Sequence, residues 1–217
     1  MKTAYPISRL PDLALEKALA FQGLGPVAGL DEAGRGAWAG PVVAAAVVLP
    51  LHDPALLAPL KGLRDSKKLS PAARLHYYQQ LQSVALAVGV GHAAPQAVDQ
   101  MGLLPATHKA MLAALQALGL QPAALLIDHL RLPHVSLPQY PLTAGDDRSL
   151  SIAAASVIAK VTRDQWMAEL DRRYPGYGFG QHKGYGTRSH RQALARLGPS
   201  PIHRRSYAPV AGSNMAE

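Results

Sequence analysis

The chain has 217 residues, 48% of them apolar, which is enough to bury one substantial core. Its 22 lysines and arginines against 14 acidic residues give a formal net charge of +8, which favours a polyanionic partner. The absence of cysteine excludes disulfides, zinc–thiolate sites and thiol catalysis. No apolar run approaches the ~18 residues of a membrane span and the N-terminus lacks a signal-peptide core, so we expect a soluble, cytoplasmic protein with no membrane partner.

The first elements expected are one helix and two strands. Residues Leu13–Phe21 predict a helix with Asp12 as its N-cap, to which we assign no chemistry. Small and branched residues at Pro26–Leu30 predict a buried strand, and the apolar run Pro41–Leu49 predicts a second. Because the connection is short, we expect these strands to pair antiparallel as a central hairpin.

Two neighbouring acids lie between these strands, in the stretch Gly29–Gly36 (GLDEAGRG). Adjacent strand residues point to opposite faces, so Asp31 and Glu32 share one site only if the backbone bends directly after Asp31. The glycines that follow permit such a bend, and Arg35 offers a planar fork for a phosphate or sugar edge. The stretch suggests metal ions meeting a nucleic-acid backbone, whereas taken alone it also fits a solvated turn.

The middle of the chain predicts a helix, a strand and a helix pair. Residues Ser70–Leu81 predict a helix that is capped by its serine and opened by a proline. Residues Val84–His92 predict a third strand. Residues Ala94–Leu118 predict two short helices that are separated at Leu104–Pro105.

Further acids follow in the second half of the chain. The buried strand predicted at Ala123–Asp128 ends on an acid, at the edge where open α/β sheets bind ligands, although a turn or helix N-cap is the alternative. The proline-rich residues Pro133–Pro141 come next. A further acid, Asp146, then precedes the long helix predicted from Ser149 to about Arg173. Its neighbour Asp147 is expected to cap the helix or to face water.

The C-terminal part interleaves aromatic residues, glycines and bases over Tyr174–Gly186. This composition suits stacking on a sugar or base beside phosphate contacts, and a packed aromatic loop is the alternative. A last helix is predicted at Thr187–Leu197, and Ile202–Tyr207 forms a short basic segment near an unstructured end.

Four acids fall at strand ends or just before a helix: Asp31, Glu32, Asp128 and Asp146. Oxygen-only ligands select a hard ion such as Mg²⁺ or Mn²⁺. Four such carboxylates repel one another, so we expect divalent cations to neutralise them. Two ions bridged by a phosphate would activate water and stabilise the leaving oxygen, which is phosphodiester hydrolysis.

The sequence resembles bacterial ribonuclease HII, of the type 2 ribonuclease H family, from about Val27 to Pro209. The resemblance rests on Gly29–Gly36, Gly40–Val43, Asp65–Leu69, Leu126–Asp128, Gly145–Asp146, Ala153–Lys160 with Thr162–Asp164, His182–Tyr185 and His203–Ser206. It implies an α/β ribonuclease H-like fold, a central mixed five-stranded sheet flanked by helices, with a C-terminal helical extension. The expected division is an N-terminal extension at 1–25, the catalytic domain with its C-terminal helical part at 26–209, and a flexible tail at 210–217.

The resemblance also implies an endonuclease of the two-metal-ion type, dependent on Mg²⁺ or Mn²⁺. It would hydrolyse the RNA strand of RNA–DNA hybrids and cut 5′ to single ribonucleotides embedded in duplex DNA, leaving 5′-phosphate and 3′-hydroxyl ends. The implied metal-binding and catalytic residues are Asp31, Glu32, Asp128 and Asp146. Gly34, Arg35 and Gly36 would read the 2′-hydroxyl, Tyr185 would stack on the following sugar, and Ser66, Lys67 and Lys183 would hold phosphates.

Two residues depart from the family pattern. His129 stands where a glycine follows the fourth strand's acid, and Ala144 stands where a lysine precedes Gly145. Neither change removes a ligand, and we expect His129 to face solvent rather than to crowd the metal edge or assist proton transfer. Few residues precede the first strand, which argues for type HII over type HIII with its extra N-terminal domain.

Two alternatives come from other classes. A nucleic-acid-binding protein without catalysis would explain the positive net charge. Such a protein would gain nothing from four acids near the phosphates that it binds, which argues against this alternative. A different metal nuclease of this fold, such as a Holliday-junction resolvase or an exonuclease, is distinguished by the Gly-Arg-Gly loop. The sequence leaves the preferred metal open, a monomer is expected, and nothing in the sequence supports docking on a replication clamp.

Overall fold

The computed structural model describes residues 10–212, in which five strands form one mixed sheet of order β3-β2-β1-β4-β5. The strands are β1 (Val27–Ala33), β2 (Val42–Val48), β3 (Ala87–Ala93), β4 (Ala124–Asp128) and β5 (Gln139–Leu142). Strand β1 pairs antiparallel with β2 and parallel with β4, which confirms the expected hairpin. Strands β2 and β3 are antiparallel and β4 and β5 are parallel, so the predicted mixed five-stranded sheet is confirmed.

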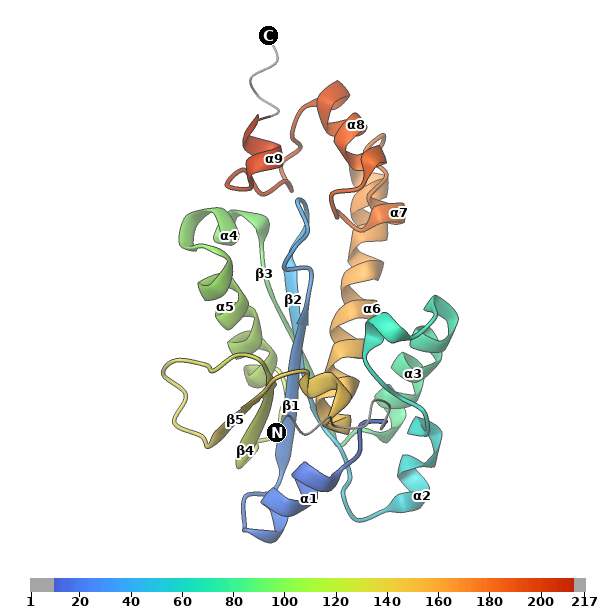
Figure 1. The fold of residues 1–217 in the computed structure, drawn as a ribbon, viewed down its shortest axis with the longest axis vertical. Helices are drawn as coiled ribbons and strands as arrows, with labels where there is room; N and C mark the ends of the chain where they lie inside the picture. Colours follow the sequence, from blue (N-terminus) through green and yellow to red (C-terminus); the bar gives the residue numbers. More distant parts are fainter. Residues whose placement is uncertain (1–9, 213–217) are drawn as a thin grey trace, which may run out of the picture.

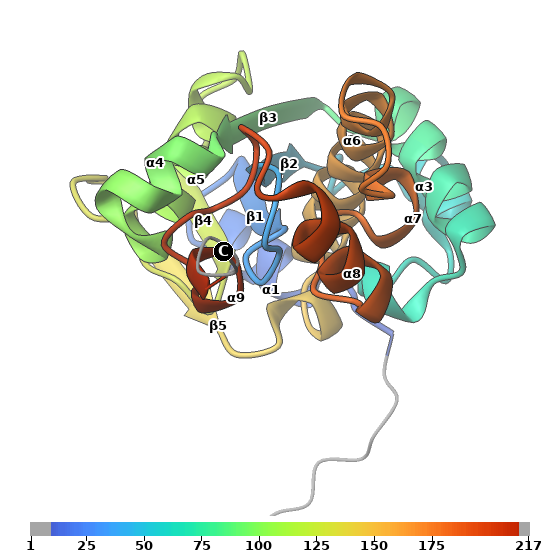
Figure 2. The same cartoon turned by 90° about the horizontal axis from the view of Figure 1, so that it is seen from above.

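Helices cover both faces of this sheet (Figure 1). The helical elements are α1 (Ala14–Phe21), α2 (Pro54–Leu57), η1 (Ala58–Leu60), η2 (Ser66–Lys68), α3 (Pro71–Val84), α4 (Pro95–Met101), α5 (Leu103–Gln116), η3 (Gly145–Asp147), α6 (Leu150–Arg173), α7 (Phe179–His182), α8 (Arg188–Leu197) and α9 (Ala208–Ala211). Helices α4 and α5 lie on one face and α3 and α6 on the other, while α8 and α9 lie beyond the end of β1 (Figures 1 and 2). None of the helices in residues 10–212 is long and apolar enough to span a membrane.

The apolar run of β2 is explained by burial on both faces. Val42 and Ala44 belong to the core under α5, whereas Ala45 and Val47 belong to the core under α6. A strand covered on both sides needs apolar residues at every position, and all seven residues of β2 are buried.

Several boundaries differ from the sequence-based prediction. Helix α3 continues to Val84, so β3 begins at Ala87 and not at the predicted Val84. Helix α1 begins at Ala14, whose N–H is accepted by the Asp12 carboxylate at 2.9 Å, so Leu13 is the N-cap residue. The break between α4 and α5 is at Gly102, which has φ +85°, because Pro105 is tolerated in the first turn of α5. The proline-rich stretch contains the edge strand β5, where a missing N–H is harmless.

The segments before β1 and after α8 pack onto the same body. Glu16 of α1 is fully buried and accepts hydrogen bonds from the Ser149 hydroxyl at 2.6 Å and the Ser151 N–H at 3.0 Å. Val210, at the start of the expected tail, is buried in α9. Residues 1–9 of the expected extension and 213–217 of the tail lie outside the described residues.

Candidate active site

Asp31 and Asp128 occupy equivalent places on two neighbouring parallel strands. The pairing of β1 with β4 runs to Leu30 and Ile127, so the next residue of each strand lies beside the other on one face of the sheet. That face is covered by α6, because Gly29, two residues before Asp31, lies against the backbone of α6. Asp31 is 5% exposed, which places its carboxylate in a site shielded by the long helix.

Asp146 is brought to these two acids by a turn rather than by a strand. It lies in η3, and the preceding Gly145 N–H donates to Asp128 Oδ1 at 2.8 Å. Asp146 is buried, whereas Asp147 forms a 2.6 Å ion pair with Lys68 at the surface. The expectation that Asp147 faces water is therefore confirmed, and the alternative that it caps the long helix is wrong, because Ser149 caps α6.

Glu32 points to the opposite face of the sheet from Asp31. The predicted bend directly after Asp31 is wrong, because β1 continues its pairing with β2 as far as Ala33. The backbone stays extended there, and the Glu32 N–H donates to Asp31 Oδ1 at 2.7 Å. Glu32 Oε1 accepts from Arg35 at 3.2 Å, while Oε2 is buried with no hydrogen-bond partner among residues 10–212. Glu32 therefore reaches the site from the strand's other side.

The acids perturb one another electrostatically. Burial, and then the charges of Glu32 and Asp128, raise the pKa of Asp31 well above its usual range. Burial also raises the pKa of Glu32. Burial, followed by the carboxylates of Asp65 and Asp128, raises the pKa of Asp146 to about 6. Groups that resist ionisation in this way favour a neutralising cation.

The donor chemistry fits a hard divalent cation that the substrate helps to hold. In the part of the chain that the structure describes, no group of three or more His, Cys, Asp or Glu side chains could hold a metal ion by itself. Magnesium typically uses one or two carboxylates and fills its remaining positions with water and substrate phosphates. The unpartnered Glu32 oxygen and the mutually repelling acids suit that open arrangement.

The segment Asp65–Lys67 adds a cation and a further acid. Asp65 Oδ1 accepts from the Lys67 N–H at 2.9 Å and so caps η2. Burial lowers the pKa of Lys67, but the charges of Asp65 and Asp31 outweigh it and the net shift is upward. Ser66 is buried, and its N–H donates to Ser156 at 3.1 Å. Lys67 thus stays charged beside the acids, and Asp65 is an acid that the sequence reasoning did not assign.

Two buried arginines hold the glycine loop that follows β1. Gly34 has φ +93°, and a Cβ there would lie 2.0 Å from Arg163 Nε, so only glycine fits. Arg204 donates to the carbonyls of Gly34 and Arg35 at 2.7 Å each. Both arginines are fully buried, whereas Gly36 is exposed. The sequence reasoning missed both arginines because charge alone predicts a solvated side chain.

Lys183 and Tyr185 both contact Arg163. The Lys183 ammonium donates to the carbonyl of Gly180, and the Lys183 carbonyl accepts from Arg163 at 2.9 Å. The Tyr185 ring has Arg163 Cζ 5.3 Å and Lys160 Nζ 5.6 Å from its centroid. Within residues 10–212 neither side chain bonds an acid of the site. Arg163, which also lies against Gly34, links them to the glycine loop.

The two departures from the family pattern both have left-handed backbones. His129 has φ +54° and Ala144 has φ +51°, which explains a glycine at the first position but gives no reason for a lysine at the second. His129 is exposed, as expected, and its N–H donates to the Leu142 carbonyl at 3.0 Å.

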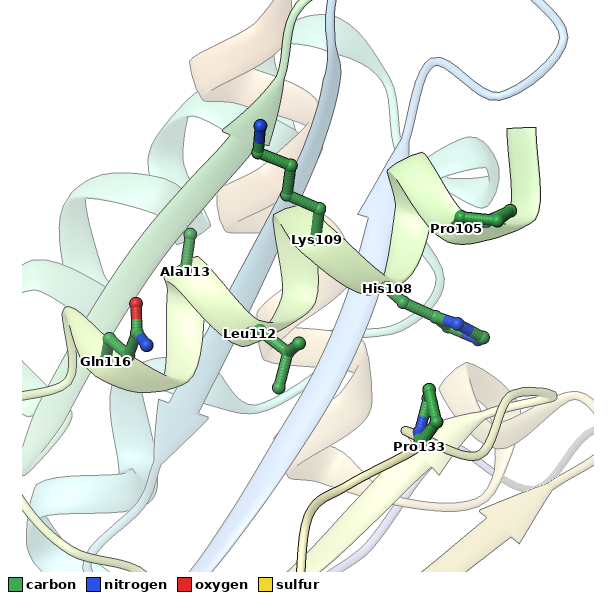
Figure 3. A pocket seen from close by; sticks show the side chains of 7 residues that line it. All are labelled: Pro105, His108, Lys109, Leu112, Ala113, Gln116 and Pro133. Carbon is green, nitrogen blue, oxygen red and sulfur yellow. The ribbon is translucent and has the colours of Figure 1, made fainter. Parts of the chain in front are cut away.

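A separate hollow lies along the outer side of α5 (Figure 3). It has a volume of about 430 Å³ and is lined by Pro105, His108, Lys109, Leu112, Ala113, Gln116 and Pro133. The His108 side chain extends from α5 on the side where Pro133 lies. None of the described residues lining it is a sequence-predicted site residue, so the hollow is distinct from the acid cluster.

Fold and site together define a class of protein. A mixed sheet of this order, with acids at the ends of its adjacent parallel strands and before a long helix, is that of the ribonuclease H-like nucleases. The sequence model described as Ribonuclease HII matches residues 28–210. A Ribonuclease HII of Chloroflexus aurantiacus is 56% identical over 204 residues, covering 93% of this chain and 95% of the relative. The chain belongs to the ribonuclease HII family and is a nuclease of the ribonuclease H class.

Solved structures agree with this assignment. The ribonuclease H2 of Pyrococcus horikoshii OT3 superposes with a TM-score of 0.69 at 26% identity, covering 86% of this chain and 96% of that one. The RNase HII of Archaeoglobus fulgidus, solved in complex with PCNA, gives a TM-score of 0.67 at 25% identity, covering 82% and 92%. These neighbours are ribonuclease H structures, and this chain has a helical C-terminal part, which together confirm the predicted fold class.

Proposed function

We propose that the chain is a divalent-metal-dependent endonuclease that hydrolyses the RNA strand of RNA–DNA hybrids. It also cuts on the 5′ side of single ribonucleotides embedded in duplex DNA, leaving 5′-phosphate and 3′-hydroxyl ends. The observation that carries this proposal is the placement of Asp31 beside Asp128, with Asp146 joined to them through the Gly145–Asp128 hydrogen bond.

The acids would supply the metal-binding part of the site. Asp31, Glu32, Asp128 and Asp146 would hold Mg²⁺ or Mn²⁺. A cation bound there supplies Lewis acidity toward the scissile phosphate and a more acidic water. Asp128 fixes the turn that carries Asp146, and the Lys67 ammonium offers a positive charge to a phosphate next to the acids.

The other predicted residues supply substrate recognition. Gly34, Arg35 and Gly36 form a partly exposed loop that can approach the ribose 2′-hydroxyl, the group that separates RNA from DNA. Tyr185, whose ring lies near the cations of Lys160 and Arg163, would stack on the next sugar. Ser66 and Lys183 are proposed phosphate contacts, and Lys183 has to release the Gly180 carbonyl to make one.

The deciding experiment uses an end-labelled DNA duplex with one ribonucleotide, incubated in Mg²⁺, in Mn²⁺ and in EDTA. We expect one cut on the 5′ side of the ribonucleotide in either metal and none in EDTA. Mass spectrometry of the products identifies the ends. Binding without cleavage would favour the non-catalytic alternative, and cleavage of a four-way junction in preference to this duplex would favour a resolvase.

We also propose that the chain acts as a monomer on its duplex substrate. Size-exclusion chromatography with light scattering tests this, and a stable dimer would contradict it. The Archaeoglobus relative was solved with PCNA, so a sliding clamp is the protein partner to add to the same column. Co-elution would show that this chain binds the clamp.

A further inference from the structure

Arg204 is fully buried, and its guanidinium holds two consecutive peptide groups of the loop after β1. Nη1 donates to the Arg35 carbonyl at 2.7 Å and to the Tyr207 hydroxyl at 3.0 Å. Nη2 donates to the carbonyls of Gly34 at 2.7 Å and Gly40 at 3.0 Å, and Nε donates to Gly40 at 3.2 Å. The Tyr207 hydroxyl donates to the same Arg35 carbonyl at 2.6 Å. A planar fork with five N–H donors fixes the orientation of both peptides, which a single ammonium cannot do.

These contacts determine which way the loop's N–H groups face. The peptide groups from Gly34 to Gly36 are trans, and in a planar trans peptide the N–H points opposite to the carbonyl. The Arg35 N–H therefore points away from Arg204, and so does the Gly36 N–H. Within residues 10–212 neither N–H donates a hydrogen bond. Because Gly36 is exposed, these two donors are available to an incoming oxygen.

Asp99 on α4 anchors the residues that follow Arg204. Its Oδ2 accepts from the Arg205 N–H at 2.9 Å. Its Oδ1 accepts from the Ser206 N–H at 2.9 Å and from the Ser206 hydroxyl at 2.6 Å. The other side of the loop is fixed independently, because Arg163 fills the space beside Gly34. The C-terminal segment is therefore tied to α4 at one end and inserts a rigid donor group behind the loop at the other.

We propose that Arg204 is a positioning residue which, held by Asp99, orients the Gly34–Gly36 loop so that its free N–H groups recognise a ribose 2′-hydroxyl. The inference rests on the proposed function, in which this loop meets the ribonucleotide. Arg204 does not touch the substrate. It sets the preference for a ribonucleotide over a deoxyribonucleotide through the carbonyls of Gly34 and Arg35.

The test measures the Kd of two DNA duplexes that differ only in one ribonucleotide. The measurement is made in Mg²⁺ with Asp128→Asn as the uncleaving background, and the readout is the ratio of the two affinities. Arg204→Lys keeps the positive charge but loses the planar guanidinium, so at least one hydrogen bond to a charged group is lost. We expect the preference for the ribonucleotide duplex to fall roughly tenfold, or to disappear so that the ratio is one. The affinity for the all-DNA duplex should stay unchanged.

Two further variants complete the design. Arg205→Lys is the matched control, because the Arg205 side chain is exposed and only its backbone N–H is used. It should keep the ratio. Asp99→Ala removes the hydrogen bonds to Arg205 and Ser206 without changing the buried guanidinium, so it should lower the affinity ratio several-fold. It tests the positioning role even if Arg204→Lys fails to fold.

The outcomes separate the two hypotheses. An unchanged ratio in the folded variants of Arg204 and Asp99, or an equal loss on both duplexes, overturns the positioning role. If the Asp128→Asn background itself binds both duplexes equally, the proposed function is contradicted, and this inference with it.

Discussion

Asp128 Oδ1 accepts a hydrogen bond from the Gly145 N–H at 2.8 Å, so one acid of the site fixes the turn that carries another. A Cβ at position 145 would lie 3.2 Å from the same oxygen and 2.7 Å from Ile152, so the contact also depends on a small residue. Asp128 therefore has two functions: one oxygen orients the turn with Asp146, and the carboxylate adds charge to the site.

Asp128→Asn separates these two functions, since an amide oxygen can still accept from Gly145 while the charge is lost. We expect kcat to fall by more than about 100-fold, because even supporting residues around metal ligands contribute 10–100-fold. Duplex affinity should change little. Asp147→Asn is the control, as Asp147 pairs with Lys68 at the surface and should keep most activity. Cleavage by Asp128→Asn at the wild-type rate in Mg²⁺ would refute its assigned role.

Tyr185→Ala tests the stacking role. Stacking on an aromatic ring contributes about 1–3 kcal/mol, so kcat/KM for a duplex with one ribonucleotide should fall roughly 5- to 150-fold. Tyr185→Phe keeps the ring and should restore most of the rate. The affinity for an all-DNA duplex should fall less than the cleavage rate; equal losses on both would count against stacking at the junction.

The strands and long helices were predictable because their signals are local. The apolar run of β2, the cap Ser70, the beginnings of two helices at Ser149 and Thr187, and the acid that ends β4 all appear where expected. Two of the errors have a common cause, which is that strand pairing decides the outcome. Strand β1 stays extended past its acids because β2 continues beside it, and a proline-containing segment becomes β5 because it lies at the sheet's edge.

The site was only partly predictable for the same reason. Residue type and strand ends were enough to propose Asp31 and Asp128 as neighbours, but the side of the sheet reached by Glu32 depended on the register of β1. Arg163 and Arg204 are buried by contacts to residues more than 100 positions away in sequence. No local pattern distinguishes such an arginine from a solvated one.

The left-handed backbone of His129 lowers the free energy of unfolding. Its φ of +54° lies in the left-handed region, which costs a non-glycine residue about 1–2 kcal/mol. Glycine removes that strain but adds about 0.5–1 kcal/mol of unfolded-state entropy. We expect His129→Gly to raise the free energy of unfolding by about 0.5–1 kcal/mol in urea titrations. His52→Gly, at an exposed histidine outside the left-handed region, should not stabilise; a loss of stability in His129→Gly would contradict the strain argument.

A chain of neutral histidines supports the backbone of Tyr185. His190 Nδ1 lies 3.0 Å from the Tyr185 carbonyl, to which it donates. The Ser200 N–H donates to His203 Nδ1 at 2.9 Å, and His203 Nε2 lies 3.0 Å from His190 Nε2, so the proton of that bond belongs to His203. Burial lowers the pKa of both histidines to about 4. A second proton would place two donors face to face and break the chain.

Because the pKa values of His190 and His203 are lowered, these histidines make the free energy of unfolding fall as the pH falls. An ordinary histidine titrates near 6.5, so below that pH the unfolded chain binds protons that the folded chain refuses until about pH 4. Each histidine contributes a slope of at most about 1.4 kcal/mol per pH unit in that window. The acid cluster has the opposite sign, because its raised pKa values make the folded chain take up protons first. The wild-type curve therefore mixes the two effects.

His203→Gln isolates the histidine contribution, because a glutamine amide can still donate toward His190 but does not titrate. We expect the variant to be less stable than wild type at pH 7 and the difference to shrink as the pH falls from 6.5 to 4. Urea unfolding at four pH values measures it. His76→Gln, at an exposed histidine on α3, should give a curve parallel to wild type. A difference that stays constant for His203→Gln would mean that His203 takes up its proton in the folded chain as readily as in the unfolded chain, and the neutral chain would then have to be rejected.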